Sequence, residues 1–518
     1  MIGAAAALSP GARRALLTIC TMTATIMQAL DTTIANVALP YMQGSLSASL
    51  DQISWVLTSY IVAAAVMTAP VGWLSDRFGR KKLFIVCVGG FTIASLLCAL
   101  SQSIEQIVAF RLLQGMCGAA LVPLSQSVML DAYPLEQRGQ AMGIWGVGVM
   151  LGPIMGPTLG GWLTENYSWH WVFLVNLPVG VLTVLGLLVF MDETKRQAHL
   201  KFDWFGFLAL AAGIVGMQLM LDRGEQLGWF GSPEIVAELI ISVAGFYYFF
   251  AHSLTTPEPF VRFAIFRDRN FLVGCFFMLI MGLMLFSSMA LSAPFIQNVL
   301  GYPIETTGWV LASRGLGTLF GMLLIGRLLR MFEARWLILI GLTLTALTMY
   351  QMTGFTTDTS ARTIVIIGLV QGFGMGFVFI PLSTVAFLTL EPRYRTDGTS
   401  MLTLVRNVAS SAGISVVIAN LTNMTTTFRS HLAEHISPFN DALQQMDVAR
   451  WLDLATDQGR ALADQMITLQ AVIMAYANDF MLLTLICVLS IPFIFAIGST
   501  ASLRGGRVSM REHAPAME

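Results

Sequence analysis

Long apolar segments dominate this sequence and constrain its fold more than any other feature. A helix needs about 20 predominantly apolar residues to cross the hydrocarbon core of a bilayer. Windows of that length predict fourteen helices, near residues 15–38, 52–74, 83–101, 104–128, 139–162, 170–190, 204–221, 235–252, 270–296, 306–328, 336–354, 363–388, 398–420 and 475–499. The chain is therefore expected to be an all-α polytopic membrane protein.

The sparse charges support this interpretation and orient the helices. Only 11% of the residues are charged, whereas soluble domains contain about 25%. Most of the 29 Lys and Arg residues fall on one side of the predicted spans. Because cytoplasmic loops are enriched in Lys and Arg, we expect that side to be cytoplasmic, with both termini on it.

What the sequence lacks disfavours several kinds of function. A net charge of −1 argues against nucleic-acid binding, which needs a basic surface. The six cysteines include no CxxC pair and are expected to be small core residues, not metal ligands. No GxxxxGK[ST] loop for a nucleotide is present. We therefore expect no cofactor, and a proton gradient in place of ATP as the energy source.

A glycine-rich run at residues 146–161 (GVGVMLGPIMGPTLGG) interrupts the fifth apolar segment. Positions four apart share one face of a helix, so these glycines form a strip that another helix can approach closely. Prolines inside a helix bend it. We expect a hinge and proton seal between two halves of the protein, made by Gly148, Gly152, Pro153, Gly156, Pro157, Gly160 and Gly161.

An internal repeat predicts those halves. Gln114-Gly115 precedes Pro123-Leu124-Ser125, and Gln371-Gly372 precedes Pro381-Leu382-Ser383 at nearly the same spacing. Parallel repeats of this kind suit a transporter whose halves rock about a central site. The expected organisation is a six-helix half (1–200), an inserted helix pair (201–260), a second six-helix half (261–500) containing a long loop (421–475), and a tail (501–518).

Several motifs resemble one transporter family. The loop at residues 72–82 (GWLSDRFGRKK), the first-span motif at 30–40 (LDTTIANVALP) and the glycine–proline run are similar to motifs of the major facilitator superfamily and its fourteen-helix drug:proton antiporters. Residues 219–224 (LMLDRG) and the long loop are most similar to the EmrB type. This resemblance implies a bacterial inner-membrane pump with a periplasmic, EmrA-like adaptor and a TolC-like outer-membrane channel.

Asp31 is the only acidic residue well inside a predicted span. A charged side chain at the bilayer centre costs about 2.5–3.5 kcal/mol on insertion scales, so it marks a functional site by default. Arg111 lies at a comparable depth and offers a structural alternative, a plain ion pair. Burial favours a neutral carboxyl and a guanidinium favours a charged one. We expect Asp31 and Arg111 to couple transport to protons.

Further polar residues inside the spans are candidates for the substrate cavity. Gln114 shares a helical face with Arg111, and Gln28 lies one turn before Asp31. Arg314 and Arg406 have no acidic partner in the sequence, so either backbone carbonyls or anionic substrates are possible partners.

The charged loop between the second and third spans is the candidate gate. It could simply anchor the topology, but glycines flanking an acid suggest a latch that pairs in one state only. The gating residues are Gly72, Asp76, Arg77, Gly79 and Arg80.

Segment 421–475 is expected to be periplasmic, with apolar residues at helical spacing that could lie on the membrane or dock the adaptor. His431 and His435 are expected to be solvated, not metal ligands.

Taken together, we expect proton-coupled efflux of hydrophobic and amphipathic compounds from the bilayer or cytoplasm, with no enzymatic activity. The alternatives are a proton-coupled uptake permease and a non-transporting membrane scaffold or sensor.

Overall fold

The computed structural model describes residues 9–134, 137–194, 201–256, 259–329, 331–436 and 454–497, and within these ranges every regular element is a helix. Eleven helices in this part are long and apolar enough to span a membrane, or up to thirteen when each bent pair counts as one span. α15 (Ala334–Met352) lies where the remaining expected span was placed, so the described helices are consistent with the expected number of fourteen. The chain is a multi-span membrane protein.

The first half contains the six expected spans, three of them broken. They are α2 (Pro10–Ser45), α3 (Leu50–Thr68) with α4 (Val71–Phe78), α5 (Arg80–Ala99), α6 (Ile104–Gly118) with α7 (Leu121–Ala132), α8 (Arg138–Asn166), and α9 (Trp171–Leu174) with α10 (Asn176–Phe190). α3 begins with a capping box between Ser49 and Gln52 and ends at Thr68, and α4, which starts after Pro70, turns away by 57°. Proline fits this break because it lacks the N–H that a continuous helix needs.

The inserted pair is α11 (Trp204–Arg223) and α12 (Pro233–Thr255), which pack on each other. The second half follows a short 3₁₀ turn at Phe263–Arg267. Its helices are α13 (Arg269–Pro294), α14 (Ile304–Leu328), α15, α16 (Ala361–Ala386), α17 (Arg395–Glu434) and α19 (Asp457–Ser490).

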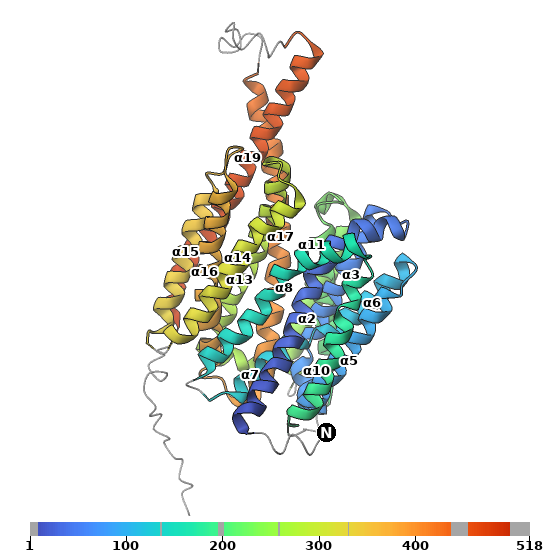
Figure 1. Ribbon diagram of the computed structural model, residues 1–518, viewed down its shortest axis with the longest axis vertical. Coiled ribbons are helices and arrows are strands. Elements are labelled where there is room, and N and C mark those ends of the chain that lie inside the picture. Colours follow the sequence, from blue (N-terminus) through green and yellow to red (C-terminus); the bar gives the residue numbers. More distant parts are fainter. Residues whose placement is uncertain are drawn as a thin grey trace, which may run out of the picture.

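The two halves repeat the same helix packing, and they lie side by side in Figure 1. α2 packs on α8 and α3 on α6, just as α13 packs on α17 and α14 on α16. Glycines mark the closest approaches in both. A Cβ at Gly115 would overlap the carbonyl of Tyr60, and one at Gly372 would overlap that of Arg314. The inserted α11 contacts α3 of one half and α17 of the other.

α8 lies between the two halves and contacts both. Near its start, a Cβ at Gly143 would lie 2.9 Å from the Met322 carbonyl on α14. The later glycines face α2, where a Cβ at Gly160 would lie 2.8 Å from Ile34 Cγ1, while Ile154 on the same helix packs on Gly315 of α14. The helix bends by 41° between Gly156 and Thr158. The expected close packing is present, and the role of the run as a hinge and proton seal between the halves stays a prediction.

The long segment 421–475 was expected to be a loop with apolar residues at helical spacing, and its described parts are mostly helical. α17 runs to Glu434 and α19 starts at Asp457, so both spans continue beyond the bundle as the projection at the top of Figure 1. An ion pair of 2.5 Å between Arg429 Nη2 and Asp464 Oδ1 joins the two helices there. Met446 and Trp451 of the expected apolar pattern lie in 437–453, outside the described residues.

Candidate proton-coupling site and contacts between the halves

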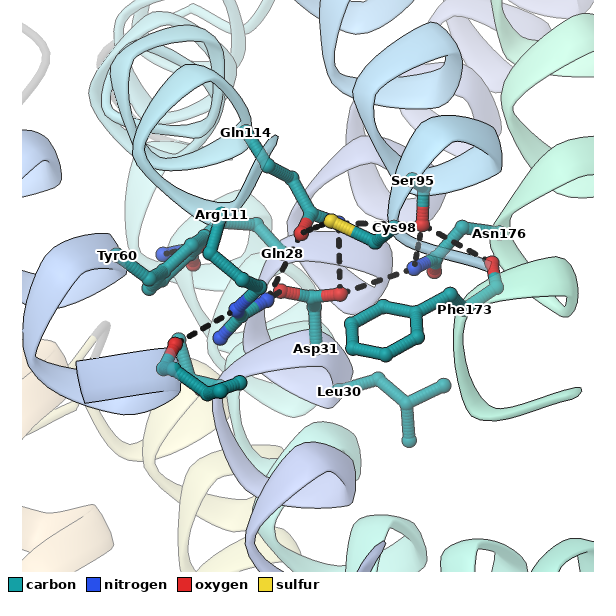
Figure 2. Close-up of polar contacts among 12 residues, drawn as sticks. Gln28, Leu30, Asp31, Tyr60, Ser95, Cys98, Arg111, Gln114, Phe173 and Asn176 are labelled. Carbon is teal, nitrogen blue, oxygen red and sulfur yellow. Dashed lines mark hydrogen bonds and ion pairs between the residues drawn. The ribbon is translucent and has the colours of Figure 1, made fainter. Parts of the chain in front are cut away.

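Asp31 is fully buried in the middle of α2 and every nearby partner is polar. Its Oδ2 accepts a hydrogen bond of 2.6 Å from Arg111 Nη1, which makes a buried ion pair. Its Oδ1 accepts from Gln114 Nε2 at 2.9 Å and from Asn176 Nδ2 at 3.1 Å. Figure 2 shows these groups converging from α2, α6 and α10. Both carboxylate oxygens therefore have donors.

Arg111 is held in place from three sides. Its Nε donates to the Val56 carbonyl at 3.0 Å and its Nη1 donates to Gln114 Oε1 at 2.8 Å. The guanidinium also lies 4.2 Å from the centre of the Tyr60 ring, where a cation is attracted to the aromatic face. α3 thus supplies a carbonyl and an aromatic ring, which fixes the charge beside Asp31.

Ser95 on α5 ties the amides of this site together. Its hydroxyl accepts from Gln114 Nε2 at 3.1 Å and from Asn176 Nδ2 at 3.0 Å, and it donates to the Phe173 carbonyl at 3.0 Å. Sequence reasoning missed Ser95 and did not place Asn176 beside Asp31. A polar residue in an apolar span was the available signal, but only packing brings these helices together.

This arrangement compensates a buried charge. Arg111, Gln114 and Asn176 supply donors to both oxygens of the Asp31 carboxylate, and the guanidinium supplies the opposite charge. A buried charge is costly unless it is paired, so moving α6 away from α2 would leave both the carboxylate and the guanidinium uncompensated. Any movement between these two helices therefore acts directly on the ion pair.

The other cavity candidates lie apart from the ion pair. Gln28 Nε2 reaches the Tyr60 hydroxyl at 3.5 Å, so it borders the site without touching Asp31. Arg406 lines a small cavity between the halves, together with Gln126, Trp145, Met278, Phe379, Leu402 and Thr403. Arg314 lies in the second half and donates to the Ser288 hydroxyl at 3.1 Å.

Ion pairs join the halves at the ends of α4, α5 and α7. Asp131 on α7 pairs with both Arg80 on α5 and Arg395 on α17. Arg80 Nη2 also donates to Thr396 Oγ1 at 2.9 Å. Because Arg80 and Asp131 belong to one half and α17 to the other, this cluster clamps the halves together at this end.

Asp76 extends the same clamp. Its Oδ2 lies 3.0 Å from Arg262 Nη2, and Arg262 Nη1 lies 3.6 Å from Asp397 Oδ2 on α17. A Cβ at Gly72 would overlap the Asp397 carboxylate, so only glycine permits this approach. Gly79 has φ +91° and packs on Glu193, whereas Arg77 is half-buried in the last turn of α4.

Comparisons with known proteins fit this architecture. The profile of the Major Facilitator Superfamily matches residues 21–422. The chain belongs to the major facilitator superfamily. It is 34% identical over 476 residues to the multidrug export protein EmrB of Escherichia coli (strain K12), which covers 90% of this chain and 92% of that protein. Within the superfamily it is an EmrB-type protein.

Two further comparisons agree. The chain is 32% identical over 493 residues to the fatty acid resistance protein FarB of Neisseria gonorrhoeae, covering 94% of this chain and 96% of that protein. The solved proton:xylose symporter XylE superposes with a TM-score of 0.59 at 13% identity, covering 95% of this chain and 97% of that one. The XylE likeness shows the shared superfamily fold.

Asp31 is not the only buried acid in this superfamily member, which corrects the sequence-based expectation. Asp479 on α19 is fully buried and accepts a 2.7 Å hydrogen bond from Asn420. Asp222 on α11 accepts from Gln218 at 3.2 Å and from Ser411 at 3.4 Å. The predicted boundaries caused the error, because α11 and α19 both continue past the limits set by hydropathy.

The side chains of Pro153 and Pro157 lie outside those described, although α8 runs through both positions. Among the described residues no group of three or more His, Cys, Asp or Glu side chains is arranged to hold a metal ion.

Proposed function

We propose that this protein exports hydrophobic and amphipathic compounds across the bacterial inner membrane in exchange for protons, with both termini in the cytoplasm. The observation that carries the proposal is its 34% identity to the multidrug export protein EmrB over 90% of the chain. The small cavity between the halves has four apolar lining residues together with Gln126, Thr403 and Arg406, a mixture that suits compounds that are largely apolar with a polar group.

The proton would be carried by Asp31. In the state described, the Asp131 cluster joins the halves at one end of the helix bundle, and Asp31 is paired with Arg111. Protonation from the periplasm would release Arg111 and favour a state in which the clamp opens. Each step then shifts a population between two states with different affinity for the proton. Gln28 and Gln114 would border the path, and residues Gly72 to Arg80 would form the gate.

Everted membrane vesicles test the direction of transport. After respiration acidifies the lumen, adding an exported compound should release protons from the lumen to the outside, measured as recovery of a pH-sensitive dye. A proton-coupled nutrient permease would carry its substrate and protons in the same direction across the membrane. A scaffold would show no proton release. Absence of proton release for every compound in a broad panel that includes cations, uncharged compounds and weak acids would contradict the proposal.

We also propose that the projecting parts of α17 and α19 dock a periplasmic adaptor that leads to an outer-membrane channel. Leu462, Met466 and Leu469 are exposed and lie on one side of α19, as spacings of four and three residues place them. An apolar stripe that leaves the bundle has no lipid to face if it stands in the periplasm, and a protein partner would cover it.

The stripe can be tested in the full-length protein. Replacing Leu462, Met466 and Leu469 together by Ser should abolish co-purification with the cognate adaptor, while proton release in everted vesicles stays at the wild-type level. Gln465→Ser on the same helix is the matched control. Unchanged co-purification by the triple variant would rule out this docking surface.

A further inference from the structure

Arg314 is a buried positive charge without a negative partner. Only 6% of the residue is exposed. Its Nη1 donates to the Ser288 hydroxyl and its Nη2 to the Ser292 hydroxyl, both at 3.1 Å, while its Nε is buried without a hydrogen-bond partner. Within the described ranges no acidic side chain forms an ion pair with it. Two neutral hydroxyls leave the charge uncompensated.

The internal repeat shows that the buried arginine occupies a different position in each half. The close approach of Gly115 to the Tyr60 carbonyl corresponds to that of Gly372 to the Arg314 carbonyl. Arg111 lies four residues before Gly115, and the residue four before Gly372 is Gly368. The second half therefore has a glycine, Gly368, at the position of Arg111. Its buried guanidinium belongs to Arg314 on α14, at the position that corresponds to Tyr60 on α3.

The carboxylate has no counterpart either. A Cβ at Gly156 would meet the Thr33 hydroxyl on α2, and one at Gly413 would meet the Ser287 hydroxyl on α13. Asp31 lies two residues before Thr33, whereas Leu285 lies two residues before Ser287. The second half thus keeps a buried guanidinium but replaces the acid by leucine.

A small cavity lies directly against this guanidinium. Its lining includes Arg314, Ser292, Ser313, Phe295, Phe355 and Phe480. Its volume of about 10 Å³ is room for one water-sized group. A buried charge is costly unless it is paired, and the described part of the chain supplies no group of opposite charge here. The cavity is too small for more than a single ion or one headgroup.

We propose that the second half binds a monovalent anion in this cavity, held by the Arg314 guanidinium. The guanidinium supplies the charge and the free Nε–H, and the aromatic lining excludes water and so strengthens the attraction. A single positive charge favours one negative charge, which disfavours sulfate and phosphate. Chloride and the carboxylate of an organic acid share this chemistry. The inference does not depend on which compounds the protein exports.

Thermal unfolding of the purified full-length protein in detergent tests the site. The reference anion is gluconate, whose polyhydroxy chain is too large for the cavity. One series replaces gluconate by chloride at constant ionic strength, and a second replaces it by formate, the smallest carboxylate. A ligand that binds only the folded state raises Tm in a saturable way. We expect a rise of about 2 °C or more in at least one series. Response to chloride alone would identify a free inorganic ion, and response to formate alone an organic carboxylate.

Two variants tie the response to this cavity. Ser288→Asp places a carboxylate on a residue that already accepts from Arg314, so it should raise Tm in gluconate and abolish the anion response. Arg314→Gln should abolish the response by removing the charge. Arg335→Gln, an arginine at the start of α15 outside the cavity lining, should keep it.

The proposal is overturned if wild-type Tm is the same in gluconate, chloride and formate. It is equally overturned if both Ser288→Asp and Arg314→Gln fold and retain the wild-type response. Proton release by everted vesicles with an uncharged compound, measured in parallel, separates failure of this site from failure of the export proposal.

Discussion

The two halves of this protein share a scaffold but not a polar centre. α2–α8 and α13–α17 approach through equivalent glycines, as do α3–α6 and α14–α16. In the first half the guanidinium of Arg111 meets the Asp31 carboxylate, with Gln114 and Asn176 as further donors. In the second half the guanidinium of Arg314 meets only serine hydroxyls.

This contrast shows which features a repeat preserves. Backbone contacts between helices need small residues at fixed positions, so the fold tolerates little change there. Polar side chains inside the bundle are free to differ as long as each charge is compensated. A titratable pair in one half and an unpaired cation in the other would let one half respond to protons while the other does not.

The largest effect is expected from Asp31→Asn. Asparagine cannot take up a proton, so proton-driven export should fall to background, while protein levels in the membrane remain measurable. Resistance of a pump-deleted host and proton release in everted vesicles are the two readouts. Asp479→Asn is the matched control in the second half, because its partner Asn420 is neutral, and export should stay near wild type. Comparable loss in both variants would break the asymmetry proposed here.

Leucine substitutions at the glycine contacts between helices should disrupt both halves to a similar extent. A leucine at Gly156 would collide with Thr33 on α2, and one at Gly413 with Ser287 on α13. We expect each change to abolish export through misfolding or a blocked conformational change. Gly161→Leu should be tolerated, because the nearest atom to a Cβ there is Val37 Cγ1 at 3.9 Å. Export assays and gel filtration give the answer, and an active Gly156→Leu protein would show that this contact is dispensable.

Removing the guanidinium of Arg111 and removing that of Arg314 should have different effects on the stability of the protein. Arg111→Gln leaves the Asp31 charge buried and unpaired, which costs about 3–5 kcal/mol. Arg314→Gln removes a charge that has no acidic partner among the described residues, so in gluconate it should be neutral or stabilising, by up to about 4 kcal/mol. Thermal unfolding in detergent measures both. Equal destabilisation by the two variants would mean that Arg314 has a partner within the protein.

The smallest effect should come from weakening the clamp that joins the halves. Asp131→Asn removes one carboxylate from Arg80 and Arg395, while the Asp76–Arg262–Asp397 chain of ion pairs remains. Partly exposed ion pairs contribute about 0.2–1 kcal/mol, so the populations should shift by less than about tenfold. Labelling of a cysteine placed at Gln126 in the cavity between the halves would report the opening, and an unchanged labelling rate would argue against a gating role.

The sequence alone predicted the family, the helical class and most of the span limits, because apolar length is a local property. It also singled out Asp31 and Arg111, since a charge inside an apolar segment is visible without a structure. It failed where a helix continues beyond its apolar part, as in α17 and α19, because polar residues can extend a span that already has a helical nucleus.

Tertiary structure decided which polar groups meet. Nothing local indicates that Ser95 and Asn176 serve the same carboxylate, or that Gly143 of α8 faces the second half while Gly156 faces α2. Nor does it indicate that Arg314 has no acidic ion-pair partner in the described part of the chain. These facts depend on helix rotation and register, which are set by packing between segments distant in sequence. The order of residues decides which charges enter the membrane region, whereas the fold determines which of them are compensated.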